Sequence, residues 1–177
     1  MGDRTHNAVI REVEPSDLPR LLELLHQLSE SSEHPEARVR PPVEAHGVAL
    51  RQIMADPNVR MVVIEEDESV VGTLTLYLLP NLSHGGRPFA IVENVVVDGS
   101  GRNGGYGRLL MDYAMQAAVD AGCYKVSLTS NMKRAPAHAF YERLGYRPTH
   151  RGFTWYLEGD AAGIDGVDHE PDAQEQV

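Results

Sequence analysis

The sequence has almost no cysteine and no long apolar run. Cys123 is the one cysteine in 177 residues, which excludes an internal disulfide and favours a reducing, cytoplasmic location. No stretch approaches the roughly 20 apolar residues that a membrane-spanning helix needs. The opening residues, MGDRTHNAVIREVE, lack the apolar core of a secretory signal. We therefore expect no membrane partner and no secretion.

Positive charge is missing from the end of the chain. Residues 159–177 contain six acidic side chains, no Lys or Arg and no aromatic residue, which predicts a solvated, disordered acidic tail. The remaining 158 residues hold 20 of the 26 acids against 16 bases and show no basic stripe, so we expect no nucleic-acid partner. This length suits one domain, predicted at 1–158. The six acids are Asp160, Asp165, Asp168, Glu170, Asp172 and Glu175.

The hydrophobic pattern predicts a mixed α/β domain. Its elements alternate in the order strand, two helices, three strands, helix, strand, helix, strand, with Ser16 as the cap of the first helix. Such an order places helices on the faces of a mixed sheet. Leucines at helical spacing from Leu18 to Leu28 form one apolar face, and Leu109, Leu110, Tyr113, Ala114 and Ala117 form another. The predicted strands are 8–13, 59–67, 69–80, 89–97, 123–130 and 151–157, and the predicted helices are 16–28, 43–55, 106–121 and 135–144, with a polar loop at 31–42.

A glycine-rich loop stands between a β-branched strand and a helix. Its residues Gly99-x-Gly101-x-x-Gly104 match a dinucleotide-binding pattern, but the acid that should follow falls on Asp120, inside a helix. A P-loop would need a lysine that the loop lacks. A second frame, R-x-x-G-x-G over 102–107, points backbone N–H groups at an anion from a helix N-terminus, which suits a pyrophosphate. The alternative is a tight turn in which glycine serves geometry alone.

Four motifs occur together around this loop. They are VENVVV before it, R-x-x-G-x-G within it, KVSLTSN after the next helix, and AHAFYERLGY. This combination resembles the GNAT superfamily of acetyl-CoA-dependent N-acetyltransferases, most strongly from Ile91 to Leu157. One departure is Tyr106, where the family usually places an aliphatic residue. The resemblance implies a GNAT fold, whose mixed, mostly antiparallel sheet splays between strands four and five and carries helices on both faces.

The resemblance also implies where acetyl-CoA binds. Backbone groups of Val95 and Val97, with Val96 between them, would hold pantetheine in the splay, and the Val95 amide would stabilise the oxyanion. The loop would bind the pyrophosphate, and Asn131 and His138 would flank the same groove. The loop residues implied are Arg102, Asn103, Gly104, Gly105, Tyr106, Gly107 and Arg108.

Two side chains carry the implied acid–base chemistry. Tyr141, in AHAFYERLGY, matches the family's general acid. A tyrosine in a helix, taken without this motif, would be expected to pack in the core. Glu93 precedes Val95 by two residues, which predicts that the two share a strand face. It is a candidate base for the ammonium substrate, and the alternative is an acid that only binds the substrate's cation. Cys123 is expected to be structural, since direct attack on a thioester needs no protein nucleophile.

The acceptor is predicted to be a small amine. TSNMKRAPAHAFYERLGYRPTHRGFTWYL looks like the aminoalkylphosphonate N-acetyltransferases, and VENVVVD with CYKVSLTS is similar to the glucosamine-6-phosphate acetyltransferases. Both groups use amines bearing phosphate or phosphonate, so a basic clamp is expected, with ordinary surface charge as the alternative. Its candidates are Arg38, Arg40, Lys133, Arg134 and Arg151.

Other outcomes stay open at this point. Glu44, His46 and His84 lie in segments expected to border the substrate, but their spacing predicts no metal site. A protein lysine or N-terminal acetyltransferase is one alternative, and a non-catalytic acyl-CoA-binding module is another. GNAT proteins are often dimers, so a homodimer is an expectation from the resemblance.

Overall fold

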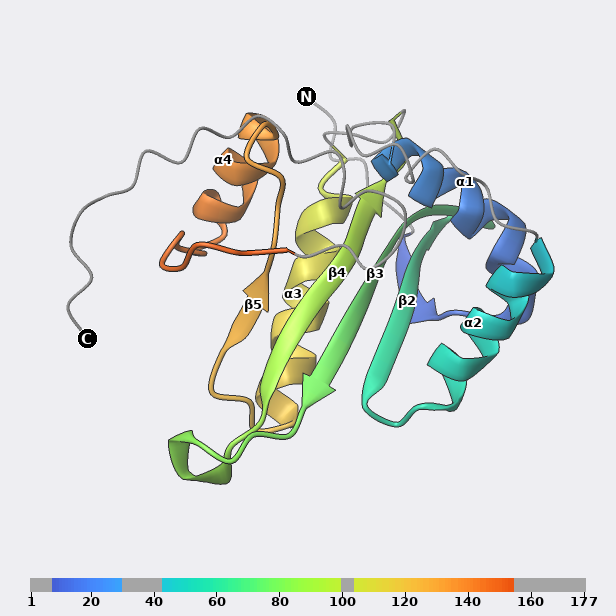
Figure 1. Cartoon of the computed structure of the whole chain (residues 1–177). Helices are drawn as coiled ribbons and strands as arrows, with labels where there is room; N and C mark the ends of the chain where they lie inside the picture. Colours follow the sequence, from blue (N-terminus) through green and yellow to red (C-terminus); the bar gives the residue numbers. More distant parts are fainter. Residues whose placement is uncertain (1–7, 30–42, 100–103, 155–177) are drawn as a thin grey trace, which may run out of the picture. The chain divides into compact units, whose positions relative to one another are not determined.

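A computed structural model describes residues 8–29, 43–99 and 104–154 (Figure 1). The chain divides between Arg147 and Pro148, and every helix and strand below belongs to the first unit. Of the second unit, residues 148–154 are described and contain no helix or strand. The predicted strand at 151–157 is therefore wrong for its first four residues, because β-branched and aromatic residues form a strand only beside an edge that pairs with them. Residues 155–157 and the predicted tail lie outside the described part.

Five strands form one sheet in chain order. They are β1 (Val9–Glu12), β2 (Val59–Glu66), β3 (Ser69–Leu79), β4 (Phe89–Val97) and β5 (Val126–Leu128). The first four pair antiparallel, and β5 joins β4 in parallel. Asp67 and Glu68, which connect β2 to β3, have φ angles of 48° and 61°, as a two-residue turn between twisted strands requires. The prediction of a mixed, mostly antiparallel sheet is confirmed.

Helices cover both faces of this sheet. α1 (Leu18–Ser29) and α2 (Val43–Ala55) pack on one face, α3 (Tyr106–Asp120) packs on the other, and α4 (Ala135–Arg143) follows β5 (Figure 1). Each face has its own apolar core. Within α3 the predicted apolar face is right for Leu110 and Ala114 but wrong for Leu109, whose side chain is 43% exposed. No helix among the described residues is long and apolar enough to cross a membrane.

The two cores are built from β-branched and leucine-rich strands against the apolar faces of the helices. We call them the α3 core and the α1–α2 core. Among the residues of the α3 core are Val62, Ile64, Leu74, Leu76, Leu78, Ala90, Val92, Tyr106, Leu110, Met111 and Ala114. Those of the α1–α2 core are Val13, Leu21, Leu24, Leu50, Met61, Val63, Val70 and Val96.

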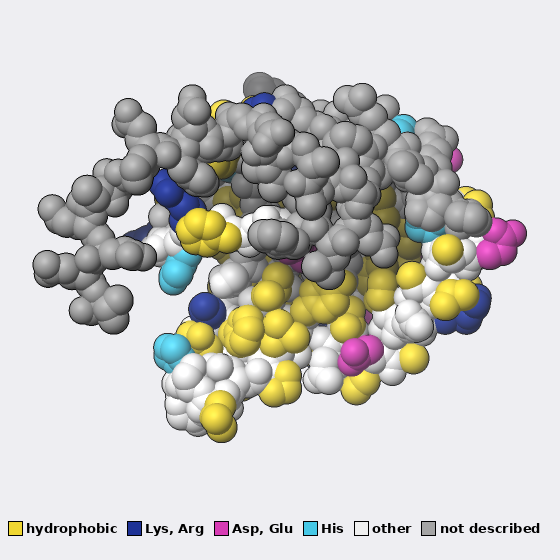
Figure 2. Space-filling model, viewed as in Figure 1, with side chains coloured by type: hydrophobic (Ala, Val, Ile, Leu, Met, Phe, Trp, Pro, Cys, Tyr) yellow, Lys and Arg dark blue, Asp and Glu magenta, His cyan; other side chains and the backbone are white. Residues whose placement is uncertain are grey.

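Apolar surface gathers at the end of the sheet where β3 turns into β4. Figure 2 shows hydrophobic side chains over the lower parts of the central strands, on the face that is viewed. Leu82, in the loop between β3 and β4, is 98% exposed. This loop precedes β4, and the glycine loop follows β4. The polar groups that hold the glycine loop therefore lie at the opposite end of the strand from Leu82.

A bulge interrupts β4 at Asn94. Asn94 has a left-handed backbone, with a φ of 56°, which asparagine tolerates better than most residues. The pairing with β3 shifts at this point, from Thr75 opposite Glu93 to Thr73 opposite Val96. β4 therefore contains one residue more than β3 between these two pairs, and an extra residue reverses the alternation of side chains beyond it.

The reversal separates Glu93 from Val95. Val92 belongs to the α3 core, but Val96 belongs to the α1–α2 core, and Val95 packs against the α3 core. Glu93 shares the face of Thr75, whose neighbours on both sides along β3 belong to the α3 core. The prediction that Glu93 and Val95 lie on the same face is therefore wrong, because the bulge adds a residue that the period-two argument does not count.

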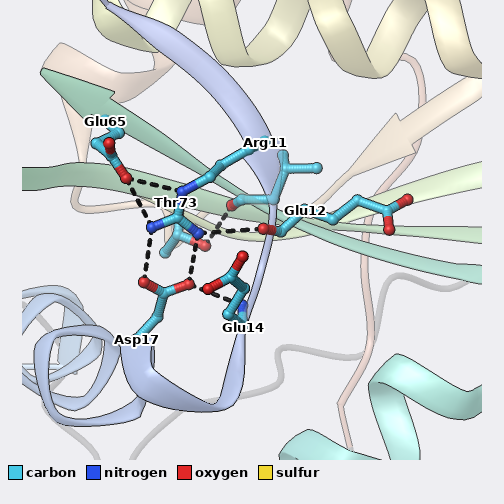
Figure 3. Close-up of polar contacts among 7 residues, drawn as sticks. Arg11, Glu12, Glu14, Asp17, Glu65 and Thr73 are labelled. Atoms are coloured by element: carbon cyan, nitrogen blue, oxygen red, sulfur yellow. Dashed lines mark hydrogen bonds and ion pairs between the residues drawn. The ribbon is translucent and has the colours of Figure 1, made fainter. Parts of the chain in front are cut away.

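A partly buried ion pair joins β1 to the turn before α1 (Figure 3). The Arg11 guanidinium donates to both carboxylate oxygens of Asp17, at 2.8 and 2.9 Å, and its Nε donates to Glu65 at 2.7 Å. Asp17 also accepts a bond from the Glu14 amide, at 2.8 Å. Ser16 is exposed and makes no capping bond in this turn, so the predicted cap is wrong, and Asp17 fixes the start of the helix.

Candidate functional site

The site is organised by the end of the pairing between β4 and β5. Parallel pairing joins Ala90–Val92 to Val126–Leu128. From Glu93 onward, β4 has no strand partner on that side among the described residues, although β3 continues to pair with it on the other side. Backbone N–H and C=O groups on an unpaired strand edge are available to an extended ligand. This arrangement is the predicted splay between the fourth and fifth strands.

Glu93 stands at the first position of β4 beyond the pairing with β5. Its side chain is partly buried, and burial raises the pKa of its carboxyl above the usual range. A carboxyl group in a poorly hydrated position holds a proton more readily than one in water, which suits a group that has to accept one.

Tyr141 lies on α4 and packs against the α3 core. Its ring is held between Phe140, with ring centres 5.2 Å apart, and Tyr146, with ring centres 6.0 Å apart. Burial is the largest cause that raises the pKa of the Tyr141 phenol, the Arg134 cation opposes the rise, and the Glu93 charge adds to it. The phenol therefore keeps its proton at neutral pH. Glu93 is thus one of the charged groups that act on the Tyr141 phenol.

The root of the glycine loop is attached to α1. Arg20 pairs with Asp98 through a short contact and donates from Nε to the Val70 carbonyl at 3.0 Å. Gln27 donates to Asp98 at 3.4 Å and accepts from the Gly99 amide at 3.2 Å. Two side chains of α1 thus fix the point at which the chain leaves β4 and enters the loop.

Gly105 and Gly107 are each required for a different physical reason. Gly105 caps α3 with a φ of 82°, and nothing lies within 4 Å of a Cβ placed there. A left-handed backbone with open space at the N-terminus of α3 is compatible with an anion site. A Cβ on Gly107 would lie 3.2 Å from Phe140 Cζ, so this glycine allows α4 to approach α3 closely. The geometric interpretation therefore holds for Gly107, and the anion-binding interpretation remains a prediction for Gly105.

The other predicted cofactor residues are dispersed over these elements. Val95 and Val97 pack against the α3 core, and Val96 is buried in the α1–α2 core, so only their backbone groups can serve a ligand. Tyr106 is 4% exposed and fills the α3 core, which explains an aromatic residue at this position. Gly104 is described, whereas Arg102 and Asn103 lie outside the described residues.

Asn131 and His138 approach each other at the start of α4. His138 Nε2 lies 2.9 Å from the Asn131 carbonyl oxygen, and the Asn131 side chain accepts the Lys133 amide at 2.9 Å. Both residues therefore order the loop before α4. Arg108 is exposed and pairs with Asp112 at 3.4 Å, one turn along α3.

Several candidates are not brought to this site. His84 stacks on Tyr124, with ring centres 4.0 Å apart, in the loop at the other end of β4. Burial raises the pKa of Cys123, which opposes thiolate formation and agrees with a structural role. No group of three His, Cys, Asp or Glu among the described residues is placed to hold a metal ion. Arg38 and Arg40 lie outside the described residues and Arg151 belongs to the second unit, so their part in a basic clamp stays a prediction.

Sequence reasoning missed two parts of the site. An asparagine inside the β-branched run VENVVV was the available signal for a bulge, since asparagine is depleted in strands and tolerates the left-handed region. The attachment of the loop by Arg20 and Gln27 left no local signal, because it depends on the packing of α1 against the end of β4.

The comparisons with known proteins agree with this geometry. Residues 21–146 match the model of the acetyltransferase (GNAT) family. The chain is 36% identical over 148 residues to a glucosamine 6-phosphate N-acetyltransferase of Trypanosoma brucei brucei, covering 80% of this chain and 90% of that protein. It is 35% identical over 101 residues to an aminoalkylphosphonate N-acetyltransferase of Salmonella typhimurium, covering 57% and 65% of the two chains. A putative acetyltransferase from Agrobacterium tumefaciens has a similar structure, with a TM-score of 0.76, 34% identity and coverage of 84% and 99%.

Proposed function

This chain belongs to the GNAT acetyltransferase family, and we propose that it transfers an acetyl group from acetyl-CoA to the primary amine of a small molecule by direct attack. The observation that carries the proposal is the position of Glu93, a partly buried carboxyl at the first residue of β4 beyond its pairing with β5. A carboxylate and a protonated phenol in one site supply the two proton transfers that aminolysis of a thioester requires.

The proposed reaction uses each group once. Glu93 accepts a proton from the ammonium substrate, directly or through a water, and the neutral amine attacks the thioester carbonyl. The Val95 amide donates to the oxyanion. As the tetrahedral intermediate collapses, the carbon–sulfur bond breaks and Tyr141 donates its proton to the leaving thiolate. Acetyl-CoA supplies the acetyl group, as in other GNAT acetyltransferases, with its pyrophosphate at the N-terminus of α3.

We propose an amine that carries a phosphate or phosphonate group. The support is twofold: two relatives are named for glucosamine 6-phosphate and for aminoalkylphosphonates, and Arg134 places a positive charge near Tyr141. A guanidinium can bind a phosphate or phosphonate through two parallel hydrogen bonds. Lys133 precedes Arg134 and is exposed, so it can add a second cation at the start of α4.

The test is a thiol-release screen with acetyl-CoA. The acceptors are glucosamine 6-phosphate, glucosamine, an aminoalkylphosphonate, the matching amine without phosphonate, a polyamine and lysine-containing peptides. Faster turnover of the phosphorylated member of each pair supports the proposal. Turnover of peptides alone would establish a protein acetyltransferase instead. Acetyl-CoA binding without any turnover would favour the non-catalytic module.

Location and assembly complete the proposal. A cytoplasmic enzyme has access to acetyl-CoA, and its single thiol, Cys123, would stay reduced there. The family's frequent dimers support a homodimer, which sedimentation equilibrium of the full chain would test.

A further inference from the structure

Thr75 carries a buried hydroxyl that has no hydrogen-bond partner among the described residues. Its side chain is fully buried in β3, and Oγ1 makes no hydrogen bond within the described part of the chain. Thr73, two residues earlier on the same strand and face, is equally buried, but its Oγ1 donates to the Val62 carbonyl at 2.7 Å. An unsatisfied buried hydroxyl destabilises a fold, and valine would fill the same volume without that cost. Packing of the sheet alone therefore does not explain a threonine at position 75.

Glu93 is the residue directly opposite Thr75. The two are paired across β3 and β4 and project from the same face of the sheet. Side chains in such a pair have Cβ atoms about 5 Å apart, so rotation of the hydroxyl brings it within hydrogen-bond reach of the carboxylate. The bulge at Asn94 follows immediately. It turns Val95 toward the α3 core, on the opposite face of the sheet from Thr75 and Glu93.

We propose that Thr75 is a positioning residue for the reaction: its hydroxyl donates to the ionised carboxylate of Glu93 and keeps that carboxylate oriented toward the amine. This inference rests on the proposed role of Glu93 as the base. The hydroxyl touches neither substrate nor cofactor. It acts because a hydrogen bond to the charged form of an acid opposes the effect of burial.

Other polar and charged groups also stand on the elements around Glu93. From α4 come the Tyr141 phenol and the Arg134 cation, which act on each other. From β3, Tyr77 lies opposite Ile91, two pairs away from the Thr75–Glu93 pair.

Helix α1, which packs on the same face of the sheet, carries Arg20, Glu23 and His26. Of these, Arg20 is held by Glu23 and Asp98. Burial is the cause that shifts the pKa of Glu93, so a neutral donor beside it has a direct effect on its ionisation.

The experiment compares the pH dependence of kcat/KM in four variants with that of the wild type. In Thr75→Val the acidic limb should move upward by about one pH unit, because the ionised carboxylate loses its donor. Thr75→Ser, which keeps a hydroxyl, should restore the wild-type limb. The matched control, Thr73→Val, should lower Tm without moving the limb. Thr75→Val should keep the fold, since valine fills the same volume, so that a moved limb reports on Glu93 and not on unfolding.

The outcomes separate this inference from the proposed function. Glu93→Gln should abolish the acidic limb. If it does so while Thr75→Val leaves the limb in place, Thr75 has no positioning role and the function stands. If Glu93→Gln leaves the limb unchanged, the proposed base is wrong and the role of Thr75 is refuted with it. Should Thr75→Val fail to fold, Thr75→Ala is used with the same expected shift, and an unshifted limb refutes the inference equally.

Discussion

Replacing Tyr141 by phenylalanine removes one oxygen atom from the site and little else. The ring keeps its contacts with Phe140 and Tyr146, at 5.2 and 6.0 Å between ring centres, so the packing of α4 should be unchanged. Burial raises the pKa of the phenol, so the hydroxyl keeps the proton that it has to donate. General acid catalysis contributes about a hundredfold to ten-thousandfold in rate. We therefore expect kcat to fall by that factor, which raises the barrier by about 3 to 5 kcal/mol at 1.36 kcal/mol for each factor of ten.

The assay follows thiol release from acetyl-CoA under saturating amine, with the CoA dissociation constant measured by calorimetry. Affinity should change by less than about twofold, because the phenol acts on the departing thiolate and not on bound CoA. Tyr146→Phe is the matched control, since it removes a phenol whose hydroxyl donates to Met115 Sδ at 3.4 Å, on the surface of α3. Its kcat should equal that of the wild type. An unchanged kcat in Tyr141→Phe, or an equal loss in both variants, would refute the acid role.

Three further predictions concern the base, the loop and the fold. Because burial raises the pKa of Glu93, the folded state binds its proton more tightly than the unfolded state. Ionised Glu93 therefore lowers stability as pH rises from the ordinary carboxyl pKa through the raised one. Glu93→Gln should raise Tm at pH 8 more than at pH 4, and an equal change at both pH values would contradict the shift. Gly105→Val forces a β-branched side chain into a φ of 82°, so CoA affinity should fall. The control is Gly86→Val, at a φ of 74° and with equally open space, before the other end of β4. It should lower stability by a similar amount but leave CoA affinity intact. Asp17→Asn should lower the free energy of unfolding by about 1.5 to 3 kcal/mol in urea, because Arg11 loses a charged hydrogen-bond partner and keeps only Glu65. The Arg11 guanidinium lowers the pKa of Asp17, so the stabilisation should be present above the ordinary carboxyl pKa and lost as pH falls below it, whereas the variant should lack that loss.

Local pattern predicted the elements of this protein well. The strand at Phe89–Val97 has the predicted bounds, and α3 begins at Tyr106 and ends within one residue of the predicted position. Both are long, strongly patterned segments bounded by glycine or proline, which leave little freedom for other structures. The strand predicted from Arg151 is wrong over its described residues, because a strand depends on a neighbouring edge that the local sequence does not contain.

Prediction of the site depended on a different kind of information. FYERLGY and the R-x-x-G-x-G loop pointed to the acid and to the pyrophosphate by resemblance, and the family match confirms the resemblance itself. The roles of Tyr141 and Glu93 stay predictions. The argument that Glu93 and Val95 share a face failed at Asn94, because counting residues along a strand assumes an uninterrupted ladder.

The sequence by itself determined the family, the order of helices and strands and the position of the glycine loop, because each depends on residues close together in the chain. The tertiary structure decided which side chains meet. The register of β4 against β3 places Thr75 opposite Glu93. The packing of α4 exposes the Tyr141 phenol to the electrostatic effect of Glu93, and α1 holds the root of the loop at Asp98. These contacts join residues far apart in the chain, and a single bulge changes them, so no local pattern encodes them.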